Sequence, residues 1–401
     1  MKEEKPGFSI LGYSTKQITI IVTSLIVILA MAYIAFYGYN LDQIQEQIFN
    51  IPWGLDVVGY TYFALMATGS SIVNSVYTIF GYKGEKGEYT KMIKYGVWFS
   101  LATIFPAWLM VLLSLAKPFD FVYILLFHRI SSRITWMALL YTFFALMLVI
   151  ELLYMVLSES FDRFKQLKYG EFAIGILVLI ATVAVHTNLG EVFGSLISMP
   201  AWYGPWLALY FILSAVLLGA AGQFIFLLPI FGKNKDIKSF MVKYYNLLFL
   251  IGISVYSLDF IWIVISGWYS RETIWPVYYS MLYGSGSFMF WGIEVFLGLI
   301  IPIALSTYGV IKRNLTASTL SAVFLLIGGF ASKYTLIILP QELRPYVWLT
   351  LQISSFTYTP PIGLIIMFAA ATILWPAVYV LGLEILPLEE NERAKHLWIF
   401  K

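Results

Sequence analysis

The segment that decides the fold reads HTNLGEVFG at residues 186–194 and PAWYGPWLALYFILSAVLLGAA at residues 200–221. It joins two apolar runs, 170–188 and 202–230, through a short aromatic loop. Each run is long enough to cross the roughly 30 Å hydrocarbon core of a bilayer as a helix. His186, Asn188 and Glu191 stand where the first run ends. Polar groups at the edge of a membrane span raise the question of whether they form a binding or proton-exchange site.

The composition extends this interpretation to the whole chain. Of 401 residues, 60% are hydrophobic and 12% are charged, about half the charged share of a soluble protein. The absence of cysteine excludes disulfides, thiolate zinc sites and iron–sulfur ligation within the chain. We therefore expect an all-α integral membrane protein, a single polytopic domain over residues 1–401, with no nucleic-acid partner. Ten spans are predicted: 17–37, 54–80, 92–116, 134–157, 170–188, 202–230, 243–267, 286–310, 319–339 and 361–382.

Lysine and arginine alternate between the predicted loops as the positive-inside rule requires. One side carries most of them: Lys2, Lys5, Lys16, Lys83, Lys86, Lys91, Lys94, Arg163, Lys165, Lys168, Lys233, Lys235, Lys238, Lys243, Lys312, Arg313, Arg393, Lys395 and Lys401. The other side has only Lys117, Arg129, Arg133, Arg271 and Arg344. This asymmetry predicts a multi-pass protein of the plasma (cytoplasmic) membrane with both termini cytoplasmic.

Ionisable residues inside the spans cluster toward the outer half. Such residues are costly in hydrocarbon and usually face the protein interior. Structural ion pairs or snorkelling side chains would explain each one alone. Five on five helices instead predict a polar pocket at the outer side, with Asp259, Glu294 and Lys333 forming a buried charge network. The five are Asp56, His186, Asp259, Glu294 and Lys333, whereas Glu151 lies toward the cytoplasm.

A weak internal repeat relates the second and sixth spans. Tyr62–Leu65 (YFAL) matches Tyr210–Leu213 (YFIL), and each is followed by small residues that let helices pack closely. Both spans run in the same direction, which predicts a parallel repeat of spans 2–5 and 6–9 as two bundles. Haem is a poor fit, because His186 has no histidine partner within the spans.

These motifs resemble the NrfD-like membrane subunits of polysulfide reductase and its relatives. The HTNLGEVFG block, the aromatic loop and the YFILSAVLLG start of the next helix carry the likeness. PWGLDVVGYTYFALMATGSS (52–71), HRISSRITWMALLYTF (128–143) and GGFASKYTLIILPQ (328–341) support it. The resemblance covers about residues 50–342 and leaves 17–37 and 361–382 as additional helices.

The resemblance implies a core of two four-helix bundles and a quinone site, menaquinone-type or other, near the outer face, without haem or metal. It implies a subunit that passes electrons between membrane quinone and an outer iron–sulfur subunit with a four-cluster ferredoxin-like fold, with proton exchange. A molybdenum-type catalytic subunit would lie beyond that partner. The chain itself would not act on the terminal substrate but would carry the quinone-reactive site of the oxidoreductase complex.

The resemblance also implies roles for individual residues. Tyr60 stands where some relatives have histidine, and Lys333 replaces the commoner arginine, which keeps the charge but loses the planar fork. The quinone and proton-exchange residues would be His186, Asp56, Tyr60, Asn188 and Glu191. A proton path from the cytoplasmic side would use Glu151 and Gln223, and partner docking would use Arg129 and Arg133, which lipid phosphates could equally bind.

Two other classes of function remain open from the sequence. A secondary transporter would also have about ten helices and buried acids, although it would more often show inverted repeats and broken helices at the midplane. A purely structural anchor would tolerate substitution of His186 and Asp56. Among respiratory complexes, the HTNLGEVFG block favours a sulfur or polysulfide system.

Overall fold

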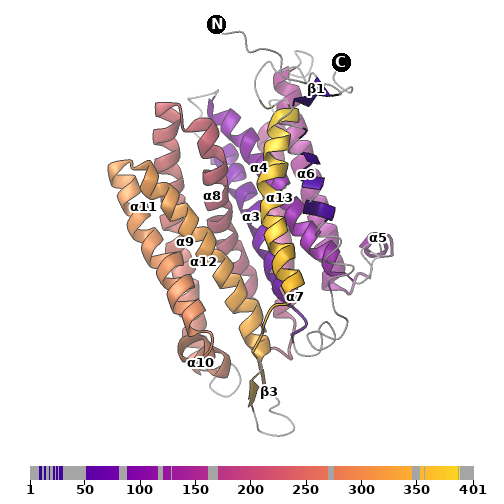
Figure 1. Ribbon diagram of the computed structural model, residues 1–401, viewed down its shortest axis with the longest axis vertical. Coiled ribbons are helices and arrows are strands. Elements are labelled where there is room, and N and C mark those ends of the chain that lie inside the picture. The colour runs from indigo at the N-terminus through magenta and orange to yellow at the C-terminus, as the bar shows by residue number, and fades with distance from the viewer. Residues whose placement is uncertain are drawn as a thin grey trace.

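The protein is a bundle of long helices (Figure 1). The structure, a computed structural model, describes residues 51–80, 88–115, 121–127, 129–160, 170–269, 275–345, 353–355, 357–386 and 388, and single positions between 9 and 29. The helices are α3 (Leu55–Phe80), α4 (Glu88–Ser114), α5 (Phe121–Leu126), α6 (Arg133–Ser160), α7 (Glu171–Gly194), α8 (Trp206–Phe231), α9 (Lys235–Tyr269), α10 (Trp275–Tyr283), the π-helix η3 (Phe288–Ile300), α11 (Ile301–Lys312), α12 (Leu315–Glu342) and α13 (Ile362–Ile385). Two antiparallel ribbons pair β1 (Ser9–Ile10) with β2 (Tyr13–Ser14) and β3 (Leu343–Pro345) with β4 (Ile353–Ser355).

Eight helical segments of the described residues are long and apolar enough to cross a membrane. Lipid offers the backbone no hydrogen bonds, so an apolar run of this length satisfies its peptide groups internally, as a helix. These eight segments, with η3 and α11 counted as one, coincide with eight of the predicted spans. The ninth, 54–80, coincides with α3, a helix of 26 residues. The predicted span 17–37 lies largely outside the described residues.

Two helix ends differ from the sequence prediction by six residues or more. Helix α7 continues to Gly194 rather than ending near residue 188, and α9 begins at Lys235 rather than near residue 243. In both places the sequence contains polar residues, which are typical of a loop. The same residues are compatible with a helix that extends beyond the hydrocarbon core of the bilayer. As a result, His186 lies eight residues, or about 12 Å, inside α7 rather than at its end.

Helices α3 and α8 form the centre of the bundle. Helix α3 packs against α4, α7, α8, α12 and α13, and α8 packs against α3, α7, α9 and α12. They cross at Gly69 and Gly219, where a Cβ on either glycine would overlap the backbone of the other helix. These are the small residues that follow the two repeated YF motifs. The repeat therefore brings its two copies into direct contact.

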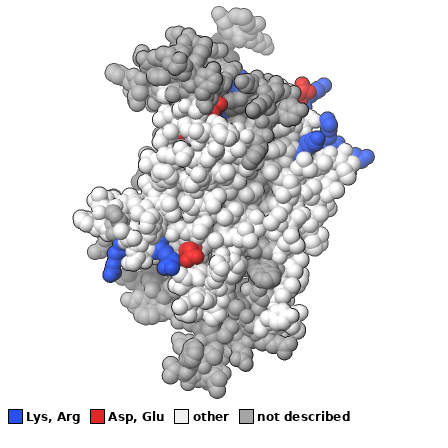
Figure 2. Space-filling model, turned by 180° about the vertical axis from the view of Figure 1, so that it is seen from behind, with Lys and Arg blue, Asp and Glu red and all other residues white. Residues whose placement is uncertain are grey.

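Charge is concentrated toward the ends of the described helices. The face drawn in Figure 2 shows charged side chains at two levels, with a wide uncharged belt between them. Arg129 and Arg133 are exposed beside α6, and Lys233, Lys235 and Lys312 are exposed where α8 meets α9 and where α11 ends. We call the end that carries α10 and β3, at the bottom of Figure 1, the α10 end.

Candidate functional site

A cavity of about 220 Å³ lies at the α10 end, between α3, α4, α6 and α7. Its walls are mainly aliphatic and aromatic, and one carboxyl and three hydroxyl groups line it. This mixture of an apolar surface with a few polar groups is typical of sites for small organic ligands. The lining residues are Trp53, Asp56, Val57, Tyr60, Thr61, Val111, Ser114, Leu115, Ile134, Met137, Leu189, Val192 and Phe193.

The start of α3 is held in place by residues distant in the sequence. The Gln341 side chain donates from Nε2 to the Trp53 carbonyl (2.8 Å) and accepts from the Trp53 amide at Oε1 (3.0 Å). The Trp53 ring stacks on Trp202 at 5.1 Å and meets Phe193 edge-on at 4.7 Å. The Leu55 amide donates to the Tyr358 hydroxyl at 2.9 Å. These contacts fix the wall of the cavity to which Asp56 and Tyr60 belong.

One polar side chain of the cavity lining has no hydrogen-bond partner among the described residues. Thr61 is fully buried, and its hydroxyl has no hydrogen-bond partner in the described part of the chain. Buried polar groups in proteins normally have a hydrogen-bond partner, and a bound water is one way in which this hydroxyl could be satisfied. Asp56 is partly exposed and shares the cavity with the Ser114 hydroxyl. A ligand here would meet a carboxylate and hydroxyl donors at adjacent positions.

Tyr60 lines the same cavity and is 6% exposed. Its ring packs edge-to-face against Tyr141 of α6, with centroids 6.0 Å apart. A phenol can donate a hydrogen bond to a carbonyl oxygen or accept one from a hydroxyl. Tyr60 and Asp56 are therefore the two predicted site residues that the structure brings together in one cavity.

His186 lies deeper than expected. It is completely buried and is not among the residues that line the cavity. Leu189, three residues or about 4.5 Å further along α7, lines it instead. The sequence predicted His186 at the end of a span, whereas the structure buries it inside α7. The imidazole is separated from the cavity by about one helical turn.

The hydrogen bonds of His186 define its tautomer. Nδ1 lies 2.7 Å from the Thr182 carbonyl oxygen, which can only accept, so Nδ1 carries a proton. Nε2 lies 2.9 Å from the Thr68 hydroxyl, and that hydroxyl is also 2.7 Å from the Ala64 carbonyl oxygen. When Thr68 donates to Nε2 the imidazole is neutral. When Thr68 donates to Ala64 instead, Nε2 can hold a proton and donate to Thr68. The site therefore accommodates both charge states without a change of partners.

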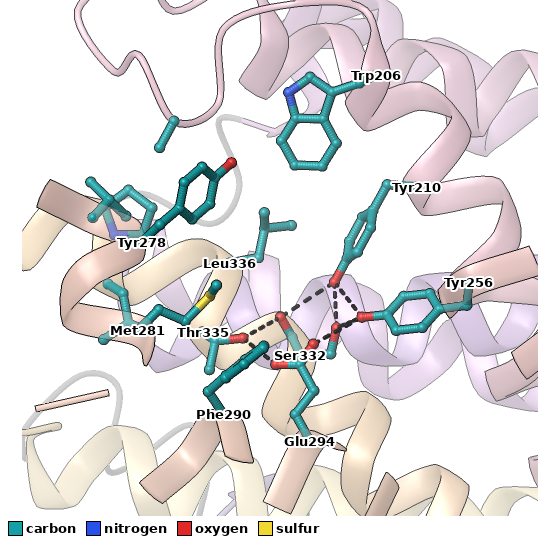
Figure 3. A pocket seen from close by; sticks show the side chains of 14 residues that line it. Trp206, Tyr210, Tyr256, Tyr278, Met281, Phe290, Glu294, Ser332, Thr335 and Leu336 are labelled. Atoms are coloured by element: carbon teal, nitrogen blue, oxygen red, sulfur yellow. Dashed lines mark hydrogen bonds between the residues drawn. The ribbon is translucent and has the colours of Figure 1, made fainter. Parts of the chain in front are cut away.

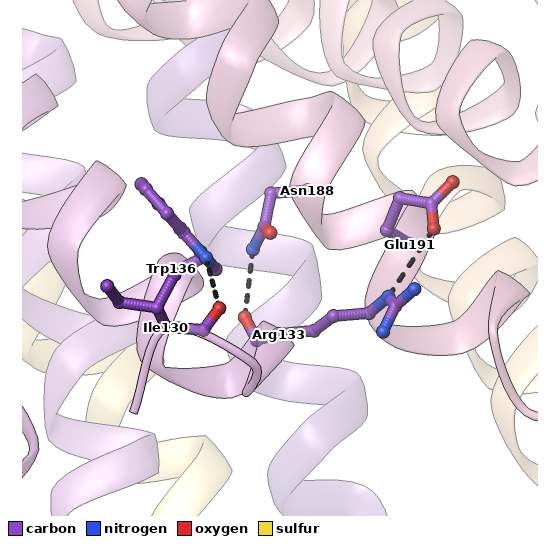
Figure 4. Close-up of polar contacts among 5 residues, drawn as sticks. All are labelled: Ile130, Arg133, Trp136, Asn188 and Glu191. Atoms are coloured by element: carbon purple, nitrogen blue, oxygen red, sulfur yellow. Dashed lines mark hydrogen bonds and ion pairs between the residues drawn. The ribbon is translucent and has the colours of Figure 1, made fainter. Parts of the chain in front are cut away.

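Asn188 and Glu191 face α6 rather than the cavity (Figure 4). The Asn188 amide donates to the Arg133 carbonyl at 3.1 Å, and Glu191 pairs with the Arg133 guanidinium at 3.5 Å. Both partners of this ion pair are nearly half exposed, so the pair adds little to stability. Arg129 is exposed nearby. The pair joins α7 to the start of α6 and leaves Asn188 and Glu191 outside the cavity lining.

Glu294 and Lys333 belong to the second half of the chain. Glu294 accepts hydrogen bonds from Tyr256 and Thr335 beside a smaller cavity (Figure 3). The Lys333 ammonium lies 3.9 Å from the centroid of the Tyr210 ring, a cation–π geometry, and it acts electrostatically on both Glu294 and His186. The third predicted member of this network, Asp259, has its side chain outside the described structure.

The two residues predicted for a cytoplasmic proton path lie apart. Gln223 donates to Asn74 at 2.6 Å and accepts from Ser70 at 3.1 Å, at the contact of α3 with α8. Glu151 is buried on α6, and its Oε1 has no hydrogen-bond partner among the described residues. Within the same part of the chain, no three His, Asp or Glu residues gather as a metal-ligand set.

Several residues that shape the cavity were not predicted from the sequence. Thr61, Ser114 and Gln341 are single polar residues in apolar segments, where side-chain oxygens are common and often bond their own helix backbone. Helix packing alone shows which of them face the cavity. The position of Gln341 directly after Pro340, near the end of α12, is a signal that could have pointed to it.

Comparison with known proteins agrees with this architecture. The family model described as polysulphide reductase, NrfD, matches residues 43–343. A selenate reductase subunit of Mesobacillus selenatarsenatis is 24% identical over 331 residues, which cover 73% of this chain and 75% of that protein. The Hdr-like menaquinol oxidoreductase integral membrane subunit of Archaeoglobus fulgidus is 25% identical over 197 residues, 48% of this chain and 47% of that protein.

Proposed function

Because the chain belongs to the NrfD family of polysulphide reductase membrane subunits, we propose that it is the quinol-oxidising membrane subunit of a respiratory reductase complex. The substrate would bind with its head group in the cavity lined by Asp56, Tyr60 and Thr61. One observation carries this proposal most directly. Thr61 lines a cavity of about 220 Å³, and its buried hydroxyl has no hydrogen-bond partner among the described residues. A cavity of this kind suits an oxygen-bearing aromatic ring.

The polar groups of the cavity suit the chemistry of a quinol. Oxidation of a quinol releases two electrons and two protons. Asp56, in its carboxylate form, accepts a hydrogen bond and then a proton from a hydroxyl of the substrate. Thr61 and Tyr60 donate to or accept from the second oxygen as its protonation changes. Trp53 and Phe193 cover the ring faces and exclude bulk water.

His186 is proposed to act as a proton acceptor behind the cavity. Its Nε2 and the Thr68 hydroxyl form a buried pair that admits both charge states of the imidazole. Histidine is suited to this role because Nε2 can take up a proton while Nδ1 keeps its hydrogen bond to the Thr182 carbonyl. The route from the cavity to Nε2 spans about one helical turn past Leu189, so a proton needs one intervening water or a side-chain movement. Asn188 and Glu191 support the position of α7 in this proposal and do not contact the substrate.

The proposed topology places the α10 end at the outer face of the plasma membrane. In this arrangement α3, α4, α6 and α7 form one four-helix bundle, and α8, α9, η3 with α11, and α12 form the second. In each proposed bundle the first helix contacts the last, α3 with α7 and α8 with α12, and these equivalent contacts support the two-bundle arrangement. Both termini would lie in the cytoplasm, with the lysine-rich loops, and residues 17–37 and 361–382 would flank the core of residues 50–342.

We propose that the exposed Arg129 and Arg133 bind an outer iron–sulfur subunit with a four-cluster ferredoxin-like fold, and that a molybdenum-type catalytic subunit lies beyond it. The names of the relatives support a reductase of this kind for a sulfur or selenium compound. The quinol would be of the menaquinol type, which the archaeal relative's name supports. Glu151 and Gln223 would connect the bundle to the cytoplasm as rungs of a proton path.

The proposal is tested by quinol-coupled turnover of the purified complex with Asp56→Asn and Thr61→Val, while co-purification of the partner subunits is monitored. We expect turnover to fall in both variants with the partners retained. Thr142→Val is the matched control, because the Thr142 hydroxyl donates to the Ala138 carbonyl of its own helix. Unchanged turnover in Asp56→Asn and Thr61→Val would refute the site. A chain that purifies without any redox partner and transports a solute would favour the transporter alternative.

A further inference from the structure

A buried carboxyl group, that of Glu294, lies in the second half of the chain, and the proposed quinol chemistry does not use it. Glu294 is 7% exposed and sits on η3. Its Oε1 accepts from the Tyr256 hydroxyl at 2.9 Å, and its Oε2 accepts from the Thr335 hydroxyl at 2.7 Å. Both oxygens are therefore hydrogen-bonded, which stabilises a carboxylate and still allows a carboxylic acid to form.

Three hydroxyl groups continue from Glu294 (Figure 3). The Tyr256 hydroxyl lies 2.6 Å from Ser332 Oγ and 3.2 Å from the Tyr210 hydroxyl, and Ser332 and Tyr210 are in direct hydrogen-bond contact. Each hydroxyl can donate one proton and accept others. A closed set of such groups next to a carboxyl can reorient its hydrogen bonds when the carboxyl gains or loses a proton.

Two cavities meet at this cluster. One, of about 50 Å³, extends from Glu294, Tyr256 and Ser332 past Tyr278 to Trp206 at the α10 end. The second, of about 20 Å³, extends in the other direction between α8, η3 and α12. A water molecule needs roughly 10–15 Å³ of such space and two or more polar partners. The first cavity therefore has room for a short file of waters that ends on Glu294.

The backbone around Glu294 is also unusual. η3 is a π-helix of 13 residues, whereas π-turns are normally single and are frequent at functional sites. Next to it, Gly298 and Gly328 bring η3 and α12 together, since a Cβ on Gly298 would lie 2.6 Å from the Gly328 Cα. This close approach lets Glu294 reach Ser332 and Thr335 on α12.

The groups that face Glu294 limit what it can bind. The titratable side chains on the neighbouring elements are Tyr210 on α8, Tyr256 on α9, Tyr278 on α10 and Lys333 on α12. The phenols are neutral near pH 7, so the Lys333 ammonium is the one cation described near the carboxyl. The Asp259 side chain lies outside the described structure. Both carboxyl oxygens of Glu294 accept from hydroxyl groups, and Lys333 lies nearby. These surroundings suit proton exchange between Glu294 and water.

We propose that Glu294 is a proton-exchange site that opens to the α10 end through its own cavity, separately from the cavity of Asp56. The carboxylic acid of Glu294 gives its proton to a water molecule of the cavity and becomes a carboxylate, and the reverse step reloads it, with no electron transferred. The hydroxyls of Tyr256, Ser332 and Tyr210 reorient with each change. The two cavities share no lining residue, so the two sites exchange protons by different routes.

Infrared difference spectroscopy tests this assignment on the full chain in lipid nanodiscs, perfused alternately with acidic and alkaline buffer. We expect a carboxylic C=O band that appears on acidification and is lost in Glu294→Gln but kept in Glu151→Gln. Thr335→Val removes one donor and should shift the band to higher wavenumber. Thr319→Val is its matched control on α12, because the Thr319 hydroxyl donates to the Leu315 carbonyl of its own helix. No quinone or partner subunit is needed, so the outcome is separate from that of the proposed function.

Exchange into deuterated buffer tests the access route. The Glu294 band should shift rapidly in the wild type and more slowly in Ala201→Leu, which adds an apolar group to the cavity lining. Ala173→Leu, on the exposed face of α7, should leave the rate unchanged. A band that does not change with pH would overturn the proposal. So would a Glu294 band that exchanges no faster than that of Glu151.

Discussion

The pair formed by Thr68 and His186 makes a quantitative prediction about Thr68→Val. Both side chains are completely buried, and valine has nearly the same size as threonine, so the substitution leaves no cavity. It removes the hydroxyl 2.9 Å from Nε2. An unsatisfied buried polar group costs about 1–3 kcal/mol, and interhelical hydrogen bonds measured in a membrane protein average about 0.6 kcal/mol with a maximum near 1.7. We therefore expect a loss of about 1–1.5 kcal/mol in the free energy of unfolding, within both ranges.

The assay is equilibrium unfolding of the purified protein in mixed micelles, run beside quinol turnover of the complex. Thr68→Ser keeps the hydroxyl and should retain most of the turnover, whereas Thr68→Val should lower it, because Nε2 loses the group that lets it change charge. Thr142→Val controls for the loss of a hydroxyl that donates within its own helix. Equal stability and equal turnover of Thr68→Val and Thr142→Val would refute the role assigned to this pair.

Three further predictions concern packing, the start of α3 and the exposed surface. Gly69→Val should prevent assembly of the bundle, because the side chain would overlap the α8 backbone; a folded, monodisperse variant in size-exclusion chromatography would contradict the close crossing. Gln341→Leu removes two hydrogen bonds to the Trp53 backbone. It should lower the free energy of unfolding by about 2 kcal/mol and raise the KM for quinol. An unchanged KM would contradict the positioning role of Gln341. Arg133→Gln should change the free energy of unfolding by less than about 0.5 kcal/mol, because the pair with Glu191 is exposed, yet it should weaken co-purification of the partner subunits. Full retention of the partners would refute the docking role.

Much of the fold could be predicted from the sequence, for a physical reason. Apolar runs of about 20 residues must be helical in lipid, so nine predicted spans coincide with observed helices, with η3 and α11 together forming one. The small residues after the two YF motifs likewise indicated close helix packing, but the sequence did not predict that the two motifs would pack against each other. The end of α7 was predicted wrongly, because Asn188 and Glu191 lie beyond the apolar run but remain helical.

The facing of side chains was less predictable. Successive helical residues point about 100° apart, so Leu189 lines the cavity while its neighbour Asn188 faces α6. In a membrane helix, lipid-facing and core-facing positions are both apolar, and the pattern that marks the buried face of a soluble helix is absent. His186 was predicted at the end of a span but is buried inside α7, about one helical turn from the cavity. The π-helix around Glu294 was not predicted from the sequence.

The central claim is that a quinol head group binds between α3, α4, α6 and α7 at the α10 end. Photoaffinity labelling with an azidoquinone, followed by mass spectrometry of the labelled peptides, tests it most directly. The account predicts labels on the segments that carry Thr61 and Leu189, and loss of these labels when unlabelled quinol competes. Competable labels confined to α8–α12, with none on α3 or α7, would contradict it.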